Sequence, residues 1–219
     1  MSEKCDTAAE DRPLSEEFLV ILIQDVINAI SKRETDDNQT NRRDLVRTAF
    51  VAIEGAAWEF KSGTVETARS LDLLSHDEEM ALMEMVYSVS GHGRVTFQQR
   101  FIPLPASIRM TARLASKINP DFQVAFEGNG WREFREAIKV RNRITHPKRK
   151  NDLTLTSKEA DACVTALNWL LNLHRLASEA TLQSMREHSK LVGEVVHGLI
   201  DGDPELRALY DSLSGKLEI

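Results

Sequence analysis

One short basic segment contains the residue types that RNA cleavage without a metal requires. It runs from Val140 to Lys150 and places Arg141, Asn142 and His146 in the order Arg-Asn-x-x-x-His. An imidazole can move a proton near neutral pH, and a guanidinium can hold a phosphate through several hydrogen bonds. Roughly 0.02 matches to this three-residue pattern are expected by chance in a chain of this composition. We therefore take these three residues as the candidate catalytic set.

The basic segment stands out because the chain as a whole is acidic, with a net charge of −6. Between Arg132 and Lys150, eight basic residues accompany only two glutamates, so this stretch carries +6 and the remainder −12. An acidic body with one basic patch fits a site that captures a few phosphates. A solvated helix face would explain the same charges. The basic residues expected to bind phosphates beside the catalytic set are Lys139, Arg143, Lys148, Arg149 and Lys150.

A phosphoryl transfer of this kind needs two proton-transfer groups. When a ribose 2′-hydroxyl attacks the adjacent phosphorus, a base serves the nucleophile and an acid serves the leaving 5′-oxygen. The basic segment supplies only one histidine. A two-fold dimer would bring His146 and its symmetry mate to one cleft. Arg141 would offset the charge that builds on the phosphorane, and Asn142 would orient the imidazole or bind a phosphate oxygen.

Apolar residues recur with helical spacing along nearly the whole chain, which predicts an all-α fold. Gly63 is expected to end the second helix, and residues 94–105 are expected to form a short hairpin or an irregular excursion. Pro147 disfavours helical geometry at His146, so one helix should stop at or just before that histidine. Thr156 and Glu159 have the spacing of a capping box that opens a long helix. The expected helices are 15–32, 41–60, 64–74, 77–88, 106–118, 131–145, 156–199 and 205–213.

The arrangement resembles a known family. A helix that ends in Arg-Asn-x-x-x-His, then a short basic loop and a long helix, is similar to the HEPN superfamily, the higher eukaryotes and prokaryotes nucleotide-binding domains. Residues 49–55, Ala-Phe-Val-Ala-Ile-Glu-Gly, also resemble the matching helix of HEPN families linked to abortive infection and toxins. The resemblance implies an antiparallel helical bundle that forms a single domain over residues 1–219. Its core helices would lie in 15–61 and 130–200, with 64–128 as a partly irregular insertion.

The resemblance also implies a function. Active HEPN members are metal-independent ribonucleases that work as homodimers, and the family motif falls on Arg141, Asn142 and His146. The expectation is an endoribonuclease that needs no cofactor and cuts RNA to 2′,3′-cyclic phosphate and 5′-hydroxyl ends. It would act as a toxin or antiviral defence effector, with an antitoxin or regulatory protein as a further partner. The alternative is a non-catalytic HEPN-like interaction module that binds a partner protein or a nucleotide.

Other features of the sequence point to a protein of the cytoplasm without a metal centre. The N-terminus lacks the basic start and apolar stretch of an export signal, and the longest apolar run, Phe18–Ile23, is far shorter than a membrane span. The histidines and cysteines show no metal-site spacing. Cys163 falls in an apolar helical pattern, as a buried structural cysteine would.

Two further residue types have open interpretations. Glu54 either pairs with Arg141 across a helix interface or is an ordinary solvated glutamate, and the rarity of buried glutamates favours the second reading. Trp58 and Trp169 lie in apolar helical patterns and are expected in the core rather than at a base-stacking surface.

Overall fold

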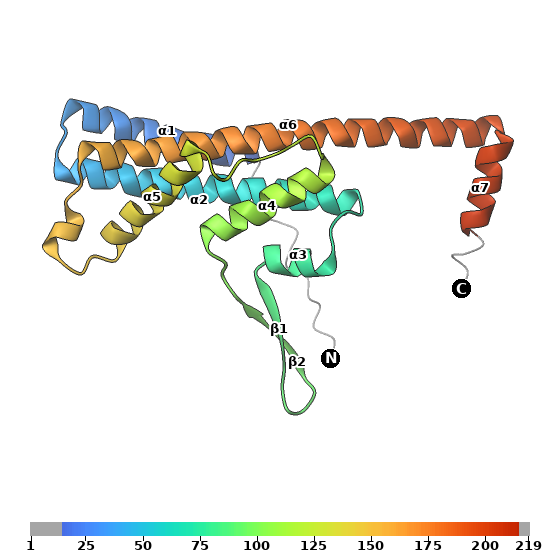
Figure 1. The fold of residues 1–219 in the computed structure, drawn as a ribbon, viewed down its shortest axis with the longest axis horizontal. Helices are drawn as coiled ribbons and strands as arrows, with labels where there is room; N and C mark the ends of the chain where they lie inside the picture. Colours follow the sequence, from blue (N-terminus) through green and yellow to red (C-terminus); the bar gives the residue numbers. More distant parts are fainter. Residues whose placement is uncertain (1–14, 215–219) are drawn as a thin grey trace.

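The computed structural model describes the backbone of residues 15–214 and the side chains of residues 18–213. Three helices run side by side along the molecule: α1 (Ser15–Thr35), α2 (Gln39–Ser70) and α6 (Ser157–Asp201). Two shorter helices, α4 (Leu104–Ile118) and α5 (Asn129–Thr145), pack across them, as Figure 1 shows. The described residues contain only one small sheet. The predicted all-α fold class is confirmed.

The remaining elements are short. They are α3 (His76–Leu82), the strands β1 (Met85–Val89) and β2 (Val95–Gln99), the 3₁₀ turn η1 (Lys150–Leu153) and α7 (Pro204–Ser214). Over residues 15–214, no helix has the length and apolar character needed to cross a bilayer.

Helix α2 lies at the centre of the core and contacts α1, α4, α5 and α6. Its small residues let these neighbours approach closely, since alanine and glycine leave little between the helix backbone and the next side chain. A Cβ atom at Gly55 would lie only 2.5 Å from the Leu22 Cδ1 atom of α1. The large buried side chains of α2 fill the remaining space. The most deeply buried apolar residues of this helix include Leu45, Val46, Ala49, Ala52, Ile53, Ala56 and Phe60.

The prediction that Gly63 ends the second helix is wrong, because α2 continues without a break to Ser70. Gly63 is exposed, and a Cβ there would meet nothing within 4 Å. An interior glycine costs a helix about 1 kcal/mol relative to alanine. Packing beyond it offsets that cost: Val65 and Ala68 are buried in a second apolar cluster with residues of α3 and α4.

The expected helix over residues 77–88 is only half correct. Helix α3 ends at Leu82, and Met85–Val89 form a strand that pairs with β2 in an antiparallel hairpin. Tyr87 lies opposite Phe97, with their ring centroids 4.9 Å apart. Cross-strand aromatic pairs of this kind stabilise a hairpin that has no third strand. Of residues 94–105, where a short hairpin or an irregular excursion was expected, Val95–Gln99 form only the second strand of this hairpin, and its first strand lies in the segment that was predicted to be helical.

Helix α4 completes the main core instead of standing apart from it. Ile108, Ala112 and Ala115 are buried against residues of α2 and α6, and Phe122 belongs to the same cluster. Part of the segment 64–128, which is expected to be an insertion, is thus needed to bury the central helices. Its status as an insertion relative to HEPN proteins stays a prediction.

The outer half of α6 extends beyond the rest of the molecule, as the orange and red end of the long helix in Figure 1 shows. The last buried residue of α6 is Thr181, twenty residues before the helix ends. The break predicted at residues 201–204 is present: Gly202 adopts a left-handed conformation with φ of 86°, and α7 leaves the end of α6 at a steep angle (Figure 1). We call residues 182–214 the arm. Its exposed large apolar residues are Leu182, Leu191, Val192, Val195, Val196, Ile200, Leu209, Tyr210 and Leu213.

Candidate active site

The end of α5 places the candidate histidine where the sequence predicts it. Helix α5 ends at Thr145, and His146 leaves helical geometry with φ of −124° and ψ of 59°. The His146 backbone N–H still donates to the Asn142 carbonyl at 3.0 Å, so the chain turns only at the histidine. The His146 side chain is exposed. Within residues 18–213, no hydrogen bond restrains its ring, which leaves both ring nitrogens accessible to a ligand.

Arg141 is fixed across the interface between α5 and α2. One Nη2 hydrogen bond goes to the carboxylate of Glu54, and Nη1 donates to the Asn142 Oδ1 atom at 3.1 Å. The guanidinium carbon also lies 5.8 Å from the centre of the Phe50 ring. The side chain remains one-third exposed, so its free donors can reach a ligand. Arg141 is thus held in place without being buried.

Glu54 therefore pairs with Arg141, and the reading of Glu54 as an unpaired, solvated glutamate is wrong. The carboxylate is about half exposed, which explains why burial statistics did not point to the pair. Three and four positions away on the same stripe of α2, Val51 and Trp58 are also exposed, at 54% and 45%. Trp58 is not in the core as expected, although Trp169 packs against Trp131 and Phe134.

Arg141 and His146 do not contact each other within one chain. Five residues along a helix correspond to a rotation of about 500°, which separates their directions by about 140°. Arg141 faces α2, as its bond to Glu54 shows, while Asn142 and His146 follow the exposed side of α5. Of the three candidate residues, the structure brings Arg141 and Asn142 into contact and leaves His146 on the adjoining surface.

Arg143 holds α5 to the start of α6. Its Nη2 atom donates to the Glu159 carboxylate at 2.8 Å and to the Thr154 carbonyl at 3.3 Å. Glu159 also closes the capping box with Thr156 that the sequence predicts. Partial burial tends to raise the pKa of Glu159, but hydrogen bonds from Thr156 and the charge of Arg143 outweigh it and lower that pKa. These contacts favour a structural role for Arg143, and its predicted contact with RNA stays a prediction.

The basic loop after His146 has a fixed backbone and free side chains. The Asp152 carboxylate accepts hydrogen bonds from the backbone N–H groups of Lys148 and Arg149 at 2.8 and 2.9 Å, and these bonds lower its pKa. Lys148, Arg149 and Lys150 are exposed, as binding to flanking phosphates requires. Lys139, one turn before Asn142, forms an exposed ion pair with Glu136 at 2.6 Å. Exposed pairs of this kind are weak and open readily for a phosphate.

The cysteine that the sequence assigns to the core does not belong to this surface. Cys163 is fully buried, and burial raises the pKa of its thiol to about 12, so it is an inert core residue. Among residues 18–213, no three His, Cys, Asp or Glu side chains are grouped as a metal site would require.

No protein-family model, curated protein or solved structure matches this chain. The resemblance to HEPN proteins rests on the motif and helix order described above.

Proposed function

We propose that this protein is a metal-independent endoribonuclease of the cytoplasm, related to HEPN proteins and active as a homodimer. One observation carries the proposal: the Arg-Asn-x-x-x-His motif lies at the end of α5, with Arg141 held by Glu54 and the His146 side chain exposed on the adjoining surface. A restrained guanidinium and an accessible imidazole, brought to one cleft by a second copy, suit phosphoryl transfer. Such catalysis depends on pre-organised charge and on a group that can exchange protons.

The proposed reaction is transesterification within RNA. The 2′-oxygen forms a bond to phosphorus while one His146 accepts the 2′-hydroxyl proton. The bond from phosphorus to the 5′-oxygen breaks, and His146 of the second copy donates a proton to that oxygen. Arg141 stabilises the extra negative charge on the phosphorane, and Asn142 holds the Nη1 side of Arg141 in place. The products are a 2′,3′-cyclic phosphate and a 5′-hydroxyl.

Homodimer formation is supported by the exposed apolar residues beside Arg141. Val51 and Trp58 flank Glu54 on α2, where a second copy would cover them. An isologous contact at this face would bring two copies of the same residues together around one axis. Cutting RNA in the cell would suit a toxin or antiviral defence effector, and an antitoxin or regulatory protein would then control it.

The test is cleavage of a mixed RNA panel in the presence of EDTA. We expect cleavage that requires a 2′-hydroxyl at the scissile position and falls at least a thousandfold in His146→Ala and in Arg141→Ala. This drop is on the order of that seen when a positioned acid-base or charge-stabilising group is lost. His188→Ala, on the exposed arm, is the matched control and should cleave normally. Activity that survives His146→Ala would contradict the proposal.

A second candidate function is a non-catalytic interaction module, and the arm favours it. Nine large apolar side chains of the arm are exposed, and surfaces of this kind mark sites of protein association. This candidate would replace the first if purified protein cleaves no RNA in the panel. The protein would also have to bind a partner equally well after His146→Ala and Arg141→Ala.

A further inference from the structure

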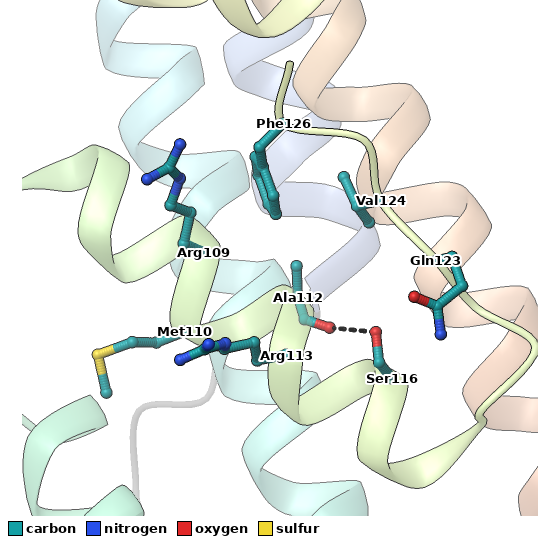
Figure 2. Close-up of a pocket in the computed structure, with 8 residues that line it drawn as sticks. All are labelled: Arg109, Met110, Ala112, Arg113, Ser116, Gln123, Val124 and Phe126. Atoms are coloured by element: carbon teal, nitrogen blue, oxygen red, sulfur yellow. Dashed lines mark hydrogen bonds between the residues drawn. The ribbon is translucent and has the colours of Figure 1, made fainter. Parts of the chain in front are cut away.

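A hollow of about 460 Å³ lies between α4 and the loop that precedes α5 (Figure 2), and none of the candidate catalytic residues lines it. Arg109 and Arg113, one turn apart on α4, line it on one side. The loop contributes Gln123, Val124 and Phe126 on the other. The hollow therefore combines two cations with an apolar wall.

The two arginines are not neutralised within the described part of the chain. No carboxylate there forms an ion pair with Arg109 or Arg113. The Arg109 guanidinium lies 5.3 Å from the centre of the Phe126 ring and 5.0 Å from that of Trp131. These cation–π contacts hold the guanidinium in place but use none of its N–H donors. The hydrogen-bonding capacity of both side chains remains available for an anion.

A second hollow, of about 250 Å³, continues the first toward α5. The two share Arg109 and Phe126, and the second is also lined by Arg132, Arg135 and Lys139 of α5. Only Glu127 and Glu136 oppose these charges in the lining, and Glu136 already pairs with Lys139. The joined hollows, which we call the α4–α5 groove, are therefore strongly cationic.

The groove leads to the candidate active site. Arg132, Arg135, Lys139 and Asn142 are spaced three or four residues apart, so they form one stripe on the exposed side of α5. His146 follows at the end of the helix. Fourteen residues of helix span about 21 Å, a distance that several nucleotides of a single strand can cover.

We propose that the α4–α5 groove binds the single-stranded RNA next to the cut site. Phosphates bind along Arg109, Arg113, Arg132 and Arg135, and one base packs against the apolar wall formed by Val124 and Phe126. This proposal rests on the proposed ribonuclease function for its substrate class. It adds a binding site that lies on α4 and its following loop, outside the Arg-Asn-x-x-x-His motif.

The test is the affinity for a fluorescent 2′-O-methyl RNA of about 12 nucleotides, long enough to fill a site of this size. The methyl group removes the nucleophile, so binding is measured without cleavage. We expect Arg109→Ala with Arg113→Ala to weaken binding about tenfold and to lower the salt dependence, as the slope of log K against log salt, by about 1.4. The charge-matched control, Arg186→Ala with Lys190→Ala on the arm, should bind as the unmodified protein does.

Two further measurements complete the design. Phe126→Leu should weaken binding about fivefold or more without changing the salt slope, because it removes stacking and no charge. Thermal unfolding of each variant separates these effects from loss of the fold. Equal affinity in the α4 double variant and its control would overturn the inference.

The outcomes also separate this inference from the proposed function. If RNA is cleaved with unchanged kcat/KM in the α4 double variant, the groove proposal fails and the ribonuclease stands. If RNA binds through Arg109 and Arg113 and is never cleaved, the groove stands and the ribonuclease fails.

Discussion

The carboxylate of Glu54 on α2 holds the guanidinium of Arg141 on α5. The candidate phosphate-binding residue is thus positioned by a residue that lies 87 positions earlier in the chain. Because both side chains are partly exposed, this pair contributes little to the free energy of unfolding, on the order of 1 kcal/mol or less. Its main consequence is the direction in which the guanidinium points.

We therefore expect Glu54→Gln to lower RNA cleavage about tenfold while the melting temperature changes little, because Arg141 keeps its charge and loses its position. Cleavage rates and thermal unfolding measure the two effects. Glu79→Gln, which breaks the exposed pair between Arg69 and Glu79 far from the motif, is the matched control. Equal cleavage in both variants would show that Glu54 does not position Arg141.

Arg143→Ala should destabilise the protein by about 2 kcal/mol, in the range for a hydrogen bond to a charged group. The substitution removes the hydrogen bonds that join α5 to the Glu159 carboxylate and to the Thr154 carbonyl. Lys148→Ala, in the adjacent exposed loop, should leave stability unchanged and weaken RNA binding at low salt. Urea unfolding and salt-dependent binding compare the two variants. A neutral Arg143→Ala would contradict the structural role.

Gly130→Ala should destabilise the protein by about 2 kcal/mol, because overpacking a tight contact forces neighbours to move. A Cβ there would lie 2.1 Å from the Trp169 Cδ1 atom, where α5 meets α6. Gly63→Ala is the control, since its Cβ would meet nothing within 4 Å and alanine favours a helix by about 1 kcal/mol. Calorimetry should show opposite shifts in melting temperature for the two variants.

The stability of the protein should fall as the pH drops below neutrality, in part through His174. Burial lowers the pKa of His174, whose ring packs 5.7 Å from that of Phe60. The unfolded chain therefore binds a proton more readily than the folded one, so stability is lost as the pH falls below about 6.5, the ordinary histidine pKa. Unfolding free energies at several pH values should show a smaller drop in His174→Gln. An identical drop would assign the loss to other groups.

Amide hydrogen exchange should be slow in the inner half of α6 and fast in its outer half. Residues 158–181 include the buried positions of this helix, whereas residues 182–201 have no buried side chain. Helices without tertiary packing open easily, so amides in the outer half should exchange at least a hundredfold faster. Mass spectrometry of peptides from both halves measures the difference. Equal protection would mean that another molecule covers the arm in solution.

The sequence predicted well those features that depend on local patterns. Pro147 indicated where α5 stops, and Thr156 with Glu159 indicated where α6 begins, because both signals act within one turn of chain. It failed at Gly63 and at β1, where packing against distant residues decided the outcome. At Gly63, the burial of Val65 and Ala68 beyond the glycine outweighs its tendency to end the helix.

The same contrast holds for the candidate site. Arg141, Asn142 and His146 form a contiguous motif that spacing alone could identify. The contact between Arg141 and Glu54, and the approach of Arg109 to Phe126 and Trp131, join residues that lie far apart in the sequence. Such contacts depend on how the helices cross. The charge run on α5 does not indicate that Arg109 of α4 lies beside it.

The unbroken length of α6 fixes the distance between the start of this helix, near the end of α5, and its outer end in the arm. Forty-five residues of helix measure about 67 Å. The outer end of α6 therefore lies nearly that distance from Glu159 and the nearby end of α5. A small regulator that contacts only this outer end would therefore not touch His146 of the same chain. Within one chain, the route from that end to the motif is α6 itself, whose tilt against α5 would shift the contact between Glu159 and Arg143.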